Sequence, residues 1–154
     1  MTPRALYSRF AFAEVVTWAL LLLGMFLKYV TETTDLGVRV FGLLHGAVFL
    51  GYCVTTVVTW INQRWSLGTG LLALAAAVPP FLTIWAERRL ERRGQLEGPW
   101  RFGPDGESPR TVPERALAWA IARPALAVVV GVVGVLVVTA VLVWIGPPIP
   151  TQES

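Results

Sequence analysis

VFGLLHGAVFLGYCVTTVVTW, residues 40–60, is the stretch of sequence that decides the fold. It contains no Asp, Glu, Lys or Arg over 21 residues, and His45 is its ionisable group of note. A helix needs about 20 mostly apolar residues to cross roughly 30 Å of hydrocarbon. We therefore expect a membrane-spanning helix over about residues 38–60.

Three further segments on either side have the same character, over about residues 7–29, 66–85 and 124–145. The last is charge-free and rich in valine, and its length and lack of alternation favour a spanning helix over a strand. Pro79 and Pro80 should kink the third segment, because each removes a backbone donor. The predicted fold is an all-α membrane protein, a four-transmembrane-helix bundle with short connections at 30–37 and 61–65 and one polar loop at 86–123.

The composition agrees with a membrane protein. Apolar residues make up 55% of the 154 residues and charged residues only 15%, against about a quarter in a soluble domain. The first apolar segment is longer than the 7–15 residues or so of a signal peptide, so we do not expect cleavage there. A single cysteine, Cys53, excludes an internal disulfide and reads as a small buried thiol.

The distribution of basic residues predicts an orientation in the cell membrane. Four antiparallel helices would put both termini and the 61–65 turn on one side with three basic residues, and the 86–123 loop opposite with ten. Cytoplasmic loops carry an excess of Lys and Arg. We therefore expect a multi-pass protein with a cytoplasmic 86–123 loop and both termini outside.

Aromatic residues near the predicted helix ends suggest interfacial belts, which form where amphipathic rings meet the headgroups. These residues are Tyr7, Tyr29, Trp60, Trp65, Trp85 and Trp144. Trp18 lies away from the ends, and we expect it to pack within the bundle.

Glu14 is the most conspicuous candidate functional residue, because a carboxylate at a helix centre costs about 2.5–3.5 kcal/mol to insert. It could be a proton or cation site. It could instead make a packing hydrogen bond, for example to Tyr52, or pair with Arg9. Lys28, which closes the first segment, is a further intramembrane polar candidate.

His45 begins a polar stripe on the second segment, where Tyr52 and Thr59 follow at intervals of seven. The stripe could be a proton relay or simply interhelical hydrogen bonding. When residues are counted from the connecting loop, the depths of His45 and Glu14 in the membrane differ by about 10 Å. We therefore expect no direct contact, and a relay would need Tyr52, Thr17 or water.

Gly42 and Gly46 flank His45 at a spacing of four, which exposes backbone for close helix packing. This pair predicts a helix-packing face.

Four arginines follow the third segment: Arg88, Arg89, Arg92 and Arg93. Near an anionic leaflet each contributes about 1 kcal/mol of attraction, so membrane lipid headgroups are their expected partners. The basic loop has no motif for reading nucleic acid, and we expect none to bind. The sequence also lacks a phosphate loop, a Ser/His/Asp set and metal-ligand spacing. We expect no metal, no cofactor and no catalytic residue.

Several short motifs together resemble a family of small bacterial integral membrane proteins of unknown function, marked by a His-Gly motif. The similar residues are Ala13-Glu14, Met25-Phe26-Leu27-Lys28-Tyr29, Val40-x-Gly42-x-x-His45-Gly46-x-x-Phe49-x-x-Tyr52, Trp65-Ser66 and Pro80-Phe81-x-Thr83. The chain departs from the family pattern at Val15, where Gly is usual, and at Phe26, where Pro is usual.

The resemblance covers about residues 5–93 and implies a three-helix domain at 1–93. Residues 94–123 would then be an added Gly/Pro/Arg-rich loop, and residues 124–154 a fourth helix with a short tail. The resemblance implies a membrane module and no activity.

Two functional hypotheses remain open. The first is a non-enzymatic module or accessory subunit that binds a membrane protein partner or a second copy of itself through the Gly42/Gly46 face. The second is a small oligomeric proton- or cation-coupled transporter using Glu14, His45 and Tyr52.

Overall fold

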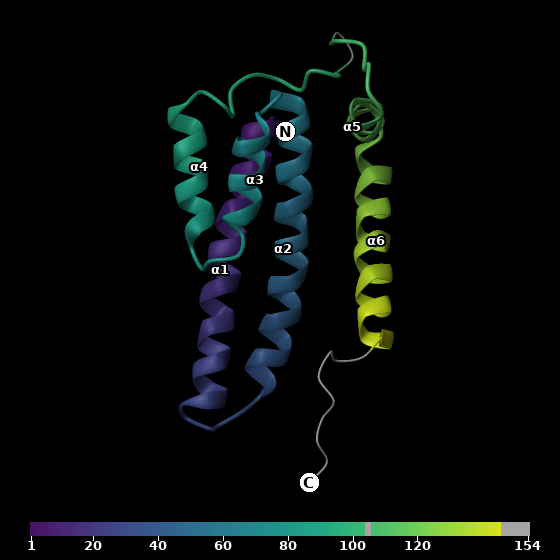
Figure 1. The fold of residues 1–154 in the computed structure, drawn as a ribbon. Helices are drawn as coiled ribbons and strands as arrows, with labels where there is room; N and C mark the ends of the chain where they lie inside the picture. Colours follow the sequence, from purple (N-terminus) through teal and green to yellow (C-terminus); the bar gives the residue numbers. More distant parts are fainter. Residues whose placement is uncertain (104–105, 146–154) are drawn as a thin grey trace.

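The computed structural model describes residues 1–103 and 106–145, and within them every regular element is a helix (Figure 1). The six helices are α1 (Pro3–Tyr29), α2 (Leu36–Gln63), α3 (Leu67–Ala75), α4 (Leu82–Arg92), α5 (Val112–Ala122) and α6 (Pro124–Ile145). The predicted tail after residue 145 lies outside the described residues. The all-α fold class is confirmed.

The two long helices α1 and α2 form an antiparallel hairpin, which is the central element of the fold (Figure 1). They have 27 and 28 residues, which correspond to about 40 Å each. Both are long and apolar enough to cross a membrane. The first two predicted spans are therefore confirmed as helices of spanning length; α1 begins four residues earlier than predicted and ends at the predicted residue, whereas α2 is two to three residues longer at each end.

The third predicted span is wrong, because residues 66–85 form a turn between two short helices and not one helix. Helix α3 ends at Ala75, the prolines lie in the turn that follows, and Phe81 has a left-handed backbone (φ 66°) before α4 begins. The chain reverses there, and α4 runs back beside α3 (Figure 1). With nine and eleven residues, the two helices are about 14 and 16 Å long, too short to cross roughly 30 Å of hydrocarbon.

This reversal places the end of α4 and the following loop at the same end of the molecule as the N-terminus. Arg4 on α1 pairs with Glu91 on α4 at 2.6 Å. The Trp100 indole N–H donates to the Met1 carbonyl at 2.7 Å. The prediction that the 86–123 loop lies opposite the N-terminus and the 61–65 turn is therefore wrong, since it counted the hairpin as a crossing.

The predicted polar loop is also more ordered than its composition suggested. Its first part is the end of α4, and α5 occupies residues 112–122. Thr111 and Glu114 form a capping box at the start of α5, in which each side chain binds the other's backbone N–H. The Trp65 indole donates to the Gln95 carbonyl at 2.8 Å, which ties the loop to the end of α2.

Helix α6 confirms the predicted helix over residues 124–145, but its described side chains do not pack into a bundle. Its leucines and valines are mostly exposed, Leu126 at 47% and Leu136 at 62% among them. Taken with α5, from which it is bent by 115°, α6 gives a third candidate membrane span in the described residues. Two to three candidate spans replace the predicted four.

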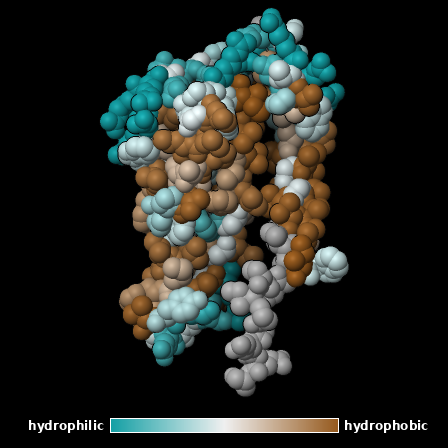
Figure 2. Space-filling view, viewed as in Figure 1, coloured by the Kyte–Doolittle hydropathy of each residue, from teal (hydrophilic) through white to brown (hydrophobic). Residues whose placement is uncertain are grey.

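Hydrophobic residues cover the middle of the molecule, and hydrophilic residues gather at its two ends (Figure 2). Of the predicted belt residues, Tyr29 and Trp144 are exposed near the ends of α1 and α6, and Trp85 is exposed near the start of α4. Tyr7 and Trp65 do not fit the belt prediction, because they are buried in the core. Trp60 is half-buried and packs against the same core.

Candidate functional site

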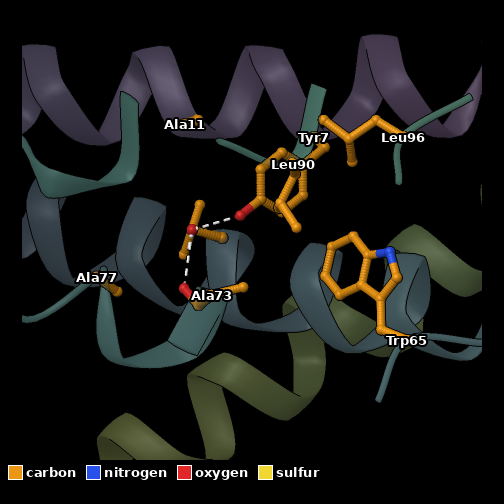
Figure 3. Packing of buried hydrophobic residues seen from close by; sticks show 8 residues of the cluster. Tyr7, Ala11, Trp65, Ala73, Ala77, Leu90 and Leu96 are labelled. Carbon is orange, nitrogen blue, oxygen red and sulfur yellow. Dashed lines mark hydrogen bonds between the residues drawn. The ribbon is translucent and has the colours of Figure 1, made fainter. Parts of the chain in front are cut away.

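The centre of the fold is a buried polar core in which Tyr52 joins three helices. Its hydroxyl lies 2.7 Å from the hydroxyl of Tyr7 on α1 and donates to the carbonyl of Ala73 on α3 at 2.9 Å. Both tyrosines are fully buried, and Figure 3 shows these two bonds among the packed side chains of the core. The bonds attach the short hairpin to the two long helices.

The predicted polar stripe on α2 faces the interior. The side chains of Tyr52, Thr55, Thr56 and Thr59 are buried, and Asn62 continues the row by one further turn. Within the described residues, the hydroxyls of Thr56 and Thr59 have no hydrogen-bond partner. The row therefore combines satisfied packing bonds with free polar atoms.

Glu14 and His45 lie together, in contrast to the prediction that they would not. A Glu14 carboxylate oxygen is 3.7 Å from Nδ1 of His45. The Thr17 hydroxyl lies 3.2 Å from the same nitrogen and 3.1 Å from the Glu14 carbonyl, to which it donates. We call these three side chains the Glu14 cluster.

The carboxylate of Glu14 is fully buried, and neither of its oxygens has a hydrogen-bond partner among the described residues. The expected bond to Tyr52 does not form, because Tyr52 is engaged with Tyr7 and Ala73. The expected pair with Arg9 does not form either, since Arg9 is exposed and outside the described ion pairs. Two free acceptor oxygens in an apolar interior are costly unless they hold a proton or a cation.

The prediction that Glu14 and His45 lie at different depths is wrong because of how the 30–35 loop folds. The hydroxyls of Thr31 and Thr33 donate to the Leu27 carbonyl, so the loop runs back along the last turn of α1. Helix α2 then begins beside residue 25 and not beside the end of α1, with Gly24 against the backbone of Gly37. In this register Glu14 lies opposite Ala47, about 3 Å along the axis from His45.

Trp18 closes the Glu14 cluster, which confirms that it packs within the helices. Its ring lies 4.5 Å from the His45 ring, centroid to centroid, and its indole N–H points to the Ala77 carbonyl at 3.5 Å. Trp18 therefore separates the cluster from the turn of the α3–α4 hairpin.

The other polar candidates lie apart from the cluster. Lys28 is near the end of α1, with its ammonium 5.1 Å from the centre of the Tyr29 ring. The four arginines lie on α4 or at its end, with Arg88, Arg92 and Arg93 exposed and Arg89 against the face of Trp85 at 5.4 Å.

Gly42 and Gly46 do not serve as a close-packing surface inside this chain. A Cβ atom at Gly46 would meet nothing within 4 Å, and one at Gly42 would meet only a Leu21 methyl at 3.9 Å. Among the helix glycines, those that do pack closely are Gly24 against Gly37, Gly51 against the Phe10 ring and Gly70 against the Trp60 ring. The Gly42/Gly46 face is therefore open, and its role in packing stays a prediction about another chain.

Two residues of the polar core were not among the candidate site residues, although Thr83 belongs to the family motif quoted above. The Thr83 hydroxyl donates to the Ala11 carbonyl at 3.1 Å, and this bond holds α4 against α1. Asn62 donates to the Pro99 carbonyl and accepts from the backbone N–H of Arg101. Asn62 could have been found as the next member of the polar stripe, whereas nothing in the sequence pairs residue 83 with residue 11.

These features define the class: a small helical membrane protein with a hydrophobic exterior and a buried polar core. The family model described as a domain of unknown function, DUF3817, matches residues 4–92, and the chain belongs to this family. The match ends where α4 ends, so α5 and α6 lie outside it. The resemblance drawn from the His-Gly motif is confirmed.

A curated protein of Streptomyces coelicolor, named "Putative membrane protein SCO5905", is 52% identical to this chain over 94 residues. The alignment covers 60% of this chain and 11% of the relative, so the matched segment makes up about a tenth of that protein's length. No solved structure matches the chain.

Proposed function

We propose that this chain is a non-enzymatic membrane module that associates through its helices with a larger membrane protein or with a second copy of itself. The carrying observation is the Streptomyces coelicolor relative, in which a segment 52% identical to this chain is a small part of a much longer protein named as a membrane protein. A module that occurs joined to a longer membrane chain is suited to act beside one as a separate subunit.

The exposed surfaces support the same proposal. Gly46 is open, and the neighbouring Leu43 is 73% exposed. Small residues on an apolar helix let another helix approach closely, which is how helices associate in lipid. Helix α6 adds a second apolar surface.

The Glu14 cluster supports a non-enzymatic role. Glu14 and Thr17 both approach Nδ1 of His45. A nucleophile–base relay needs the nucleophile at one imidazole nitrogen and the orienting carboxylate at the other. With both groups at one nitrogen, this arrangement does not provide a relay.

The distribution of charge supports a cell-membrane protein with its N-terminus in the cytoplasm. The N-terminal end of the molecule carries eleven of the 13 basic residues, and the opposite end carries Lys28 and Arg39. The eleven are Arg4, Arg9, Arg64, Arg88, Arg89, Arg92, Arg93, Arg101, Arg110, Arg115 and Arg123. Basic residues are retained on the cytoplasmic side, so the loop before α5 would be cytoplasmic together with the N-terminus.

The test of the module is the mass and composition of the native complex. The full chain is extracted in mild detergent from cells that express it naturally, and the complex is weighed by native mass spectrometry. We expect a stoichiometric second protein or a defined homo-oligomer. A monomer without a stoichiometric partner would overturn the proposal.

Gly46→Leu tests the face that carries the association. We expect the variant to reduce the complex to monomer while its helicity stays unchanged. Gly68→Leu is the matched control, because a Cβ atom there also meets nothing within 4 Å but lies at the start of α3. An unchanged complex mass in Gly46→Leu would exclude this face.

A second function, proton- or cation-coupled transport by an oligomer, is favoured by one specific observation. The buried Glu14 carboxylate has two unpartnered oxygens beside His45. Glu14→Gln should abolish proton flux in proteoliposomes that contain a pH-sensitive dye, whereas Glu32→Gln in the exposed 30–35 loop should not. Flux at the wild-type rate in Glu14→Gln would reject transport through this residue.

A further inference from the structure

A cavity of about 230 Å³ lies between the beginning of α3 and the end of α4, at the basic end of the molecule. Arg89 lines it from α4, and Arg93 lines it from the C-cap position just after α4. Ser66 and Thr69 line it from the first turn of α3, where the helix dipole places partial positive charge. The cavity is thus lined by two cations and by hydroxyl groups.

No carboxylate offsets this charge. The lining contains no Asp or Glu, and neither arginine takes part in the ion pairs of the described residues. By contrast, Arg4, Arg64 and Arg101 at the same end of the molecule are all paired with glutamates. Guanidinium groups bind phosphate with bidentate geometry, and helix N-termini also favour anions.

Gln95 adds an unsatisfied hydrogen-bond acceptor beside the cavity. Gln95 lines the wall, and its amide oxygen is buried without a hydrogen-bond partner among the described residues. A buried acceptor of this kind costs free energy unless a donor reaches it. A hydroxyl group on the ligand beside its phosphate would supply that donor once the Gln95 side chain turns toward the cavity.

The floor of the cavity is apolar. Leu72 and Leu90 lie there, and Gly68 completes the lining. Arg89 rests on Trp85, an exposed tryptophan of the kind found at membrane interfaces. A ligand with a polar head and an apolar tail would match both parts of the wall.

We propose that this cavity binds the phosphate group of an anionic, hydroxyl-bearing molecule, with a phospholipid headgroup as its source. The phosphate lies between Arg89 and Arg93 at the start of α3, and the acyl chains leave past Leu72. A headgroup hydroxyl donates to the Gln95 amide oxygen, whose side chain turns toward the cavity to accept it. The α3–α4 hairpin is thereby a lipid-binding element and not only a shortened span.

The test measures binding of dihexanoylphosphatidylglycerol to the full chain in neutral detergent, by native mass spectrometry. Arg89→Gln with Arg93→Gln should weaken binding at least tenfold. Arg88→Gln with Arg92→Gln is the matched control, since it removes the same charge from the same helix but from residues outside the cavity lining. We expect less than a threefold change in the control; equal weakening by both pairs would overturn the site in favour of diffuse attraction.

Leu72→Trp fills the cavity without changing charge and should weaken binding by a similar factor. It also keeps the proposal testable if the arginine variants fold poorly. Binding at wild-type affinity in folded Leu72→Trp would overturn the site.

Inorganic phosphate and dihexanoylphosphatidylcholine distinguish the sources. We expect millimolar phosphate to displace the anionic lipid only weakly and the phosphatidylcholine not to bind. Displacement by phosphate at the same concentration as the lipid would support the site with free phosphate as its ligand. Equal binding of phosphatidylcholine, which bears no net charge and no headgroup hydroxyl, would overturn it.

Discussion

At the scale of single residues, the polar core divides into bonds that hold the fold and atoms that remain free. Tyr52 and Thr83 attach the α3–α4 hairpin to the long helices through backbone carbonyls. Glu14 is as deeply buried, but its carboxylate oxygens make no such bond. Stability should therefore depend on the hydrogen bonds of Tyr52 and Thr83, and any proton or cation chemistry on the Glu14 carboxylate.

Tyr52→Phe tests this division. The variant removes both bonds of the hydroxyl and leaves the buried Ala73 carbonyl without its donor, so we expect a loss of about 1–3 kcal/mol in the free energy of unfolding. Tyr7→Phe should cost less, because the Tyr52 hydroxyl can still donate to Ala73. Unfolding in mixed micelles, followed by circular dichroism, gives both values; equal losses would show that the bond to Ala73 carries no weight.

At the scale of elements, the register of α1 against α2 decides which residues meet. Gly24 lets α1 touch the backbone of Gly37, and this contact, together with the folded-back 30–35 loop, places His45 beside Glu14. A residue count along the sequence cannot supply this register, because the loop could equally have extended away from the helix ends.

Gly24→Ala should separate the two helices, since its Cβ atom would lie 2.7 Å from the carbonyl carbon of Gly37. Backbone cannot move aside cheaply, and we expect a loss of about 1–3 kcal/mol in stability. Gly46→Ala is the control, and it should increase stability. Its Cβ atom meets open space, and alanine favours a helix over glycine by up to about 1 kcal/mol. Equal melting temperatures of the two variants would contradict this account of the register.

The capping box of α5 predicts a dependence on pH. The backbone N–H groups of Arg110 and Thr111, together with the Arg101 guanidinium, lower the pKa of Glu114 from 4.5 to about 2. A lowered folded-state pKa means that the stabilisation is present above the unfolded value, near 4.5, and is lost as the pH falls toward 2. Glu114→Gln should therefore be less stable than wild type at pH 6, with the difference in melting temperature closing by pH 2; a constant difference would contradict the assignment.

At the scale of the whole molecule, replacing one predicted crossing by a hairpin changes which segments share an end of the molecule. The four-span prediction gave ten basic residues against three, with the N-terminus opposite the loop. The observed reversal puts eleven basic residues at one end of the molecule and two at the other, and it brings the N-terminus and the loop together. The charge asymmetry becomes larger, as expected when topology and charge agree.

Cysteine accessibility tests this arrangement. In a Cys53→Ser background, an impermeant thiol reagent added to intact cells should label cysteine at Thr34 but not at Ser108. An N-terminal tag should be protected from external protease, and permeabilised cells should show all three sites reactive. If the tag and Ser108 were found on opposite sides, the chain would cross the membrane a third time between them, and the hairpin arrangement would be wrong.

The sequence by itself determined the membrane class, the helical fold, the two long helices and the inward polar stripe on α2. These follow from composition and from runs of apolar residues, which are local properties of the chain. It also picked out Glu14, His45 and Tyr52, since a polar group in an apolar run is visible without any structure.

Only the tertiary structure decided that Pro79 and Pro80 turn the chain back and do not merely kink it, that His45 lies beside Glu14, and that Gly46 is open. The physical reason is the same in each case. A proline, a loop or a glycine permits several geometries, and the choice among them rests on contacts between segments far apart in sequence, such as Thr83 with Ala11. Local sequence fixes what each segment can do, and long-range packing selects one of those possibilities.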